Sequence, residues 1–161
     1  MVFSGLHIVK HSYNYDSPVG RIYIAEADGA ITDVSLHPVE GAHDKETPLI
    51  LQAAAMLREY FDGNRRDFSG LPLRAVGTDF QKKAWGALLL IPYGQTRTYK
   101  EQAVVVGNPK ACRAVGAANG KNPISIIIPC HRVIGSDNSL TGYAGGLSVK
   151  KALLELERSQ G

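Results

Sequence analysis

The sequence predicts two parts: a small α/β domain over residues 1–75 and a mostly helical domain over residues 76–161 that contains a helix-turn-helix. Residues 17–36 alternate like a β-hairpin, and helix-start signals recur after Val76. The first 75 residues carry seven Lys/Arg and ten Asp/Glu, whereas the others carry eleven and five. A basic second half indicates contact with a polyanion, although ordinary surface charge is the alternative explanation.

The composition indicates a globular protein, with 44% hydrophobic and 20% charged residues among 161. No apolar run approaches the roughly 20 residues of a membrane span, so no membrane partner is expected. Cys112 and Cys130 are too few for a disulfide framework, which predicts a cytoplasmic location. They are also too few for a cysteine-rich zinc site, and no histidine pair has ligand spacing, so no metal is expected.

The first domain is predicted to contain a hairpin and a helix. Asp28-Gly29 is a hairpin turn signal, flanked by alternating apolar residues at Ile22, Ile24, Ile31, Val34 and Leu36. HPVEGAHDKETP reads as a polar loop. The apolar positions Ile50, Ala54, Leu57 and Phe61 have helical spacing, and Gly63 follows as a stop. The turn-rich segment NRRDFSGLPLRAVG predicts a domain boundary near Ala75.

The second domain is predicted to open with three helices. Thr78–Gln81 and Thr98–Glu101 are capping boxes, and the second opens a short helix that ends at Gly107. Asn108-Pro109 is predicted to supply the N-cap and first residue of a third helix, closed by Asn119-Gly120. Two short helices with this turn form a candidate helix-turn-helix, although most helical hairpins bind nothing.

The third of these helices has mostly small side chains, at Ala111, Cys112, Ala114, Gly116 and Ala117. Arg113 is the one long side chain that projects among them. Such a face approaches either a neighbouring helix or a nucleic-acid groove, and the sequence leaves both open.

The run ISIIIP is predicted to be a buried strand that ends at Pro129, so that Cys130 emerges just past the strand. A final helix is expected to place Val149, Ala152, Leu153 and Leu156 on one apolar face, with Glu155 and Glu157 on other faces.

Cys130 is the candidate nucleophile because it lies between Pro129 and the pair His131-Arg132, whereas Cys112 is interpreted as a small hydrophobe. Adjacent residues of an extended chain point opposite ways, so His131 is expected to reach the sulfur through a water or after a bend. A carboxylate would orient the imidazole, but these residues alone do not select one. Neither a phosphatase loop nor a papain-like protease fits this spacing.

The ordered motifs GNPKACRAVG, NP, IPCHRV, GYAGG and a final KxxLLxxE helix resemble the O6-alkylguanine-DNA alkyltransferases (methylated-DNA–protein-cysteine methyltransferases). The resemblance covers residues 77–157, including IPYGQTRTY, and SPVGRIYIA more weakly resembles the family's N-terminal domain. It implies a ribonuclease H-like first domain and a winged-helix, helix-turn-helix second domain.

The family resemblance also implies a function. Such proteins bind double-stranded DNA through the minor groove, flip O6-alkylguanine into a pocket and transfer the alkyl group irreversibly to a cysteine. No cofactor is needed because the protein is itself the acceptor. We expect a monomer, and the sequence leaves cooperative assembly on DNA open.

The family's site residues carry over onto matching positions. Cys130 corresponds to the acceptor, His131 to the water-mediated base, Glu157 to the carboxylate that orients it, and Asn122 to the brace of the site. Tyr99 matches the tyrosine that rotates the backbone phosphate and protonates the departing guanine. Tyr143 matches the residue that lines the base pocket, and Arg113 matches the finger that fills the space left by the flipped base. Positions where family members contact DNA are matched by Lys100, Asn108 and Ser136.

Some positions depart from the family pattern. Cys112 replaces a usual alanine, Lys100 a frequent glycine, and Ala144 a serine that faces O6 in some relatives. The first half has no cysteine, so the structural zinc of some relatives is not expected. The alternatives are an alkyltransferase-like damage sensor, which usually lacks the acceptor cysteine, and a plain helix-turn-helix regulator.

Overall fold

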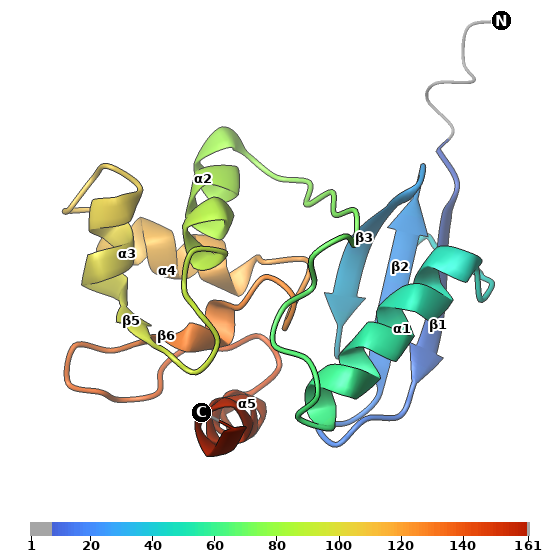
Figure 1. The fold of residues 1–161 in the computed structure, drawn as a ribbon. Coiled ribbons are helices and arrows are strands. Elements are labelled where there is room, and N and C mark those ends of the chain that lie inside the picture. The colour runs from blue at the N-terminus through green and yellow to red at the C-terminus, as the bar shows by residue number, and fades with distance from the viewer. Residues whose placement is uncertain (1–7, 161) are drawn as a thin grey trace, which may run out of the picture. The chain divides into compact units, whose positions relative to one another are not determined.

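A computed structural model describes residues 8–160, which form two compact units divided between Ala75 and Val76 (Figure 1). The first unit is a four-stranded sheet with one helix, and the second is mostly helical. This is the order of domain types that the sequence predicts. Within the described residues, no helix is long and apolar enough to cross a bilayer.

The sheet of the first unit is built around the predicted hairpin, which is confirmed. β2 (Ile22–Ala27) and β3 (Ala30–Ser35) pair antiparallel. Asp28 and Gly29 join them with φ angles of 52° and 78°, the left-handed pair that a type I′ turn requires. β1 (Lys10–Tyr15) pairs with β2, and the short β4 (His43–Asp44) completes the order β3-β2-β1-β4.

The sequence does not predict two of these strands. β1 reads KHSYNY, without an aliphatic residue, and all six of its residues are half-buried. β4 lies inside the segment interpreted as a polar loop. Both strands join the sheet by backbone pairing, and neither has alternating aliphatic residues, so hydrophobic periodicity gives no sign of them.

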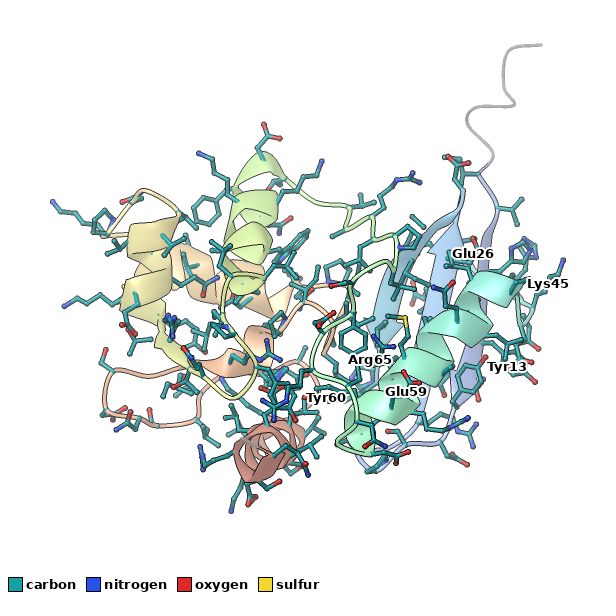
Figure 2. The ribbon with its side chains drawn as sticks, viewed as in Figure 1. Tyr13, Glu26, Lys45, Glu59, Tyr60 and Arg65 are labelled. Carbon is teal, nitrogen blue, oxygen red and sulfur yellow. The ribbon has the colours of Figure 1, made fainter. Side chains whose placement is uncertain are left out.

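α1 (Pro48–Phe61) packs against this sheet and confirms the predicted helix (Figure 1). The Thr47 side chain caps it by accepting a hydrogen bond from the Ile50 amide at 3.2 Å. Figure 2 labels Tyr60 on this helix, where the side chain is fully buried. The figure also labels Glu59 and Arg65, which form an ion pair at 2.8 Å.

The second unit contains the four helices α2 (Asp79–Leu88), α3 (Tyr99–Val105), α4 (Cys112–Gly120) and α5 (Leu147–Gln160). A short 3₁₀ turn, η2 (Cys130–Arg132), and the parallel strand pair β5 (Arg97–Thr98) and β6 (Val133–Ile134) complete it. Both predicted capping boxes are present, with Thr78 and Gln81 at α2 and Thr98 and Glu101 at α3.

A buried amide pair joins the helices around the helix-turn-helix. Gln102 of α3 and Asn119 of α4 donate to each other at 2.9 and 2.8 Å, and Gln102 also donates to the Ala84 carbonyl of α2 at 3.1 Å. Apolar contact between α3 and α4 centres on Ala103 and Val115. The orientation of α4 is therefore set by directional bonds as well as by packing.

The predicted start of α4 is wrong. The helix begins at Cys112, and Ala111 at its N-cap position makes no side-chain capping bond. Asn108 instead closes a separate turn, because its side chain accepts from the Lys110 amide at 3.2 Å and its carbonyl from the Ala111 amide at 3.0 Å. Pro109 fits the second position of such a turn.

The predicted strand at ISIIIP is also wrong, although its isoleucines are buried as expected. The chain turns there, with Ile128 N donating to Ile124 O at 2.9 Å and Ile126 at a φ of 72°. The Asn122 side chain holds both ends, accepting from Ile124 N at 3.0 Å and donating to Ile128 O at 2.8 Å. A β-branched residue in left-handed backbone is strained, so these bonds and burial outweigh strand propensity.

Candidate active site

Cys130 follows this buried turn rather than the end of a strand, and it is the first residue of η2. The residue is 7% exposed, and its sulfur accepts a hydrogen bond from Asn122 Nδ2 at 3.3 Å. Since Asn122 also fixes both ends of the isoleucine turn, one amide side chain sets the position of the sulfur and of the backbone before it.

His131 is paired with a carboxylate from the last helix. Its Nε2 lies 2.7 Å from Glu157 Oε2, and both side chains are buried. His131 Nδ1 is buried without a hydrogen-bond partner among residues 8–160. When Nε2 carries the proton and donates a hydrogen bond to an ionised Glu157, Nδ1 keeps a lone pair that can accept a second proton.

Glu157 is held by four donors. Arg132 binds it with two nitrogens, Nε to Oε1 at 2.8 Å and Nη2 to Oε2 at 3.0 Å, and the Gly94 amide donates to Oε1 at 3.2 Å. Burial raises the pKa of this carboxyl, but the bonds from His131 and Arg132 outweigh it and hold the pKa below its usual range. Glu157 is therefore a carboxylate at neutral pH.

The buried face of α5 differs from the predicted one. Its buried residues are Lys150, Leu153, Leu154 and Glu157. Of the predicted apolar set, only Leu153 is buried, so the prediction that Glu157 lies on another face is wrong. Two charged residues occupy the inner face because each has polar partners inside the unit.

Lys150 and Tyr99 meet at one backbone carbonyl. Lys150 Nζ donates to Thr141 O at 2.8 Å, and the Tyr99 hydroxyl donates to the same oxygen at 2.9 Å. The ammonium also lies 5.8 Å from the centroid of the Tyr99 ring. Tyr99, the first residue of α3, is thus tied to the loop that carries Tyr143.

Burial dominates the titration of the buried groups near the cysteine. It raises the pKa of the Cys130 thiol, while the Asn122 hydrogen bond and the Lys150 charge lower it in part. It lowers the pKa of His131, against the opposing effect of Glu157. It also raises the pKa of Tyr143, and the charge of Cys130 adds to that rise.

The residues predicted to touch DNA are exposed rather than gathered around the sulfur. Lys100, Asn108, Arg113 and Ser136 are all exposed, and Tyr99 is half-buried. Arg113 lies in the first turn of α4. The exposed side of that helix also carries Ala114 and Ala117, which leaves room for close approach to another surface.

The residue-by-residue prediction missed two site groups, Arg132 and Lys150. A signal existed for each: Arg132 directly follows His131, and Lys150 lies seven residues before Glu157 on the predicted helix, which places both on one face. No group of three or more His, Cys, Asp or Glu side chains suited to a metal ion occurs in the described part of the chain.

Comparison with known proteins matches both units to one family. Residues 9–75 match the family model for the ribonuclease-like domain of 6-O-methylguanine DNA methyltransferase, and residues 79–159 match the model for its DNA-binding domain. The chain belongs to the 6-O-methylguanine DNA methyltransferase family. The family resemblance and the fold class predicted from the sequence are both confirmed.

Members of this family with similar sequence come from archaea and bacteria. A methylated-DNA–protein-cysteine methyltransferase of Methanosarcina barkeri is 49% identical, over 89% of this chain and 94% of the relative. A constitutive enzyme of that name from Bacillus subtilis is 46% identical, over 89% and 92%. The crystal structure of Mycobacterium tuberculosis OGT in complex with DNA superposes with a TM-score of 0.87 at 45% identity, covering 93% of this chain and 94% of that one.

Proposed function

We propose that this protein is a DNA repair methyltransferase that flips O6-alkylguanine out of duplex DNA and transfers the alkyl group irreversibly to its own Cys130. The observation that carries the proposal is the buried thiol of Cys130 next to the His131–Glu157 pair, in a unit whose α3 and α4 form a helix-turn-helix. The M. tuberculosis relative, which was crystallised with DNA, supports the DNA partner.

The proposed transfer balances without a cofactor. The Cys130 thiol gives its proton to His131 Nδ1 through a water, and Glu157 stabilises the imidazolium through Nε2. The thiolate then attacks the alkyl carbon, and a C–S bond forms as the C–O6 bond breaks. The electron pair stays on the guanine, and Tyr99 donates a proton to it. The proton held on His131 then returns to the Tyr99 oxygen through solvent, so that both side chains end neutral. The thioether is stable, so each molecule acts once.

DNA recognition is assigned to exposed side chains of the proposed DNA-binding domain, residues 76–161. Arg113 would fill the space left by the flipped base, while Lys100, Asn108 and Ser136 contact the backbone. The small side chains of α4 favour the narrow minor groove. Tyr143, with its buried hydroxyl, would line the base pocket, and Asn122 would brace the site. We propose that the protein acts as a monomer in the cytoplasm.

Mass spectrometry after mixing with a duplex that carries one O6-methylguanine tests the proposal. We expect one added methyl group on the Cys130 peptide, none with undamaged DNA and none in a Cys130→Ser variant. A Cys112→Ser variant is the matched control and keeps transfer. Tight lesion binding without added mass would leave the damage-sensor alternative, and lesion-independent binding to a preferred sequence would leave the regulator.

A further inference from the structure

Arg132 is a buried residue of the cysteine motif, and the proposed reaction leaves it without a part. We infer that Arg132 is a positioning residue for alkyl transfer: it clamps Glu157 so that the carboxylate orients His131 and leaves the Cys130 proton on the imidazole. The inference rests on the proposed function and adds a residue to it.

The geometry of the clamp is bidentate and anchored at a third point. Arg132 Nε and Nη2 reach the two different oxygens of Glu157, at 2.8 and 3.0 Å. Its remaining nitrogen, Nη1, donates to the Ile91 carbonyl at 2.8 Å, and the guanidinium lies 5.7 Å from the centroid of the Tyr93 ring. One planar group therefore ties η2, α5 and the segment before α3 together.

The clamp fills the accepting positions of the carboxylate. Oε1 accepts from Arg132 Nε and the Gly94 amide, while Oε2 accepts from Arg132 Nη2 and His131. A carboxylate has about four such positions, so donors at all of them stabilise the ionised form of Glu157 and make it a weak acceptor for the Nε2 proton of His131. The proton that leaves Cys130 stays on His131, where its charge faces the carboxylate.

The clamp also fixes the angle of the imidazole. His131 and Arg132 are consecutive residues of a 3₁₀ turn, and both bind the carboxylate of Glu157. Without Arg132, the carboxyl group could rotate about its last bond and carry the His131 ring with it. A lysine would keep the charge but not the fork of two donors, so it would hold the carboxylate at a single point.

The test measures three quantities on the full chain: the single-turnover transfer rate to an O6-methylguanine duplex, the affinity for that duplex, and the melting temperature. We expect Arg132→Met to slow transfer by about 10- to 100-fold, with lesion affinity changed by less than about twofold, since no DNA contact is removed. The transfer rate of Arg132→Lys should fall between that of Arg132→Met and that of the wild type. Thr78→Ala is the control for destabilisation, because it removes the side-chain cap of α2, which touches neither Glu157 nor a residue assigned to DNA contact.

A second measurement does not depend on how well Arg132→Met folds. In ¹⁵N NMR, the wild type should show a slowly exchanging proton on His131 Nε2, and Arg132→Lys should broaden or shift it. Wild-type transfer rates in Arg132→Lys would overturn the inference, as would an equal rate loss in Thr78→Ala at equal destabilisation. Failure of the wild type to transfer would instead overturn the proposed function, and the NMR signal would still test the clamp.

Discussion

Lys150 is a fully buried cation whose ammonium bonds to a carbonyl rather than to a carboxylate. Burial lowers its pKa, and the nearby Cys130 thiolate opposes that shift. The reverse effect acts on the cysteine, whose raised pKa is lowered in part by the Lys150 charge. The lysine therefore favours the reactive form of the thiol from inside the protein.

Replacing Lys150 with Met should raise the pH at which Cys130 ionises, because the thiolate loses its nearby positive charge. The measurement is the iodoacetamide reaction rate as a function of pH, in a Cys112→Ser background so that one thiol reports. Lys151→Met, an exposed neighbour on the same helix, is the matched control. A midpoint that stays in place or moves down would contradict the effect of the charge.

His131 makes stability depend on pH. Burial holds its folded pKa below 6.5, so below that pH the unfolded chain binds more protons than the native one. Its contribution is present above pH 6.5 and is lost as the pH falls towards the folded pKa, by at most about 1.4 kcal/mol per pH unit. His131→Asn should flatten this slope in urea unfolding between pH 7 and about pH 5, a range above the titration of Glu157.

Thr78→Ala provides the control for this slope, because it removes a capping hydrogen bond of α2 and no titrating group. It should lower the unfolding free energy by the same amount across this pH range. An unchanged slope in His131→Asn would mean that other groups carry the dependence.

The relation between α3 and α4 depends on the Gln102–Asn119 pair. Gln102→Leu leaves the Asn119 amide buried without this partner, so we expect it to cost about 1–3 kcal/mol in urea unfolding. The double variant Gln102→Leu/Asn119→Leu removes both amides and should recover part of that loss. Single-variant costs that simply add in the double variant would mean that the pair is not coupled.

Local signals predicted most elements, and the errors arise where a long-range polar bond decides. The Asp28-Gly29 turn and the capping box at Thr98 are complete within four residues, so the sequence alone specifies them. The strand predicted for the isoleucine run is wrong because the side chain of Asn122, which lies outside the run, folds it into a turn. The buried face predicted for α5 is wrong because two of its buried residues, Lys150 and Glu157, are charged, and only their hydrogen-bond partners make their burial favourable.

The same distinction applies to the candidate site. Cys130 and His131 stand out because they are adjacent in sequence, and the family resemblance adds Glu157, which apolar periodicity assigns to the wrong face. Arg132 escapes prediction because a buried arginine is rare unless it is paired, and its partner is 25 residues away.

At the scale of the whole molecule, the two units differ in the sign of their net charge. Residues 1–75 are net acidic and residues 76–161 net basic, and the exposed residues assigned to DNA contact all belong to the second set. DNA affinity should therefore fall steeply with salt, since each neutralised phosphate releases counterions. The steepness of that fall counts the phosphates contacted.

Lys100→Ala should reduce the slope of log Kd against log salt concentration by about one, because one phosphate contact and its released counterion are lost. The loss should be equal for lesion-containing and undamaged duplexes, because a backbone contact carries no base information. Lys45→Ala is the matched control: this lysine, labelled in Figure 2, is also exposed but lies in the acidic first unit. Fluorescence anisotropy over a range of salt concentrations measures both slopes, and equal losses in the two variants would mean that DNA contact is not confined to residues 76–161.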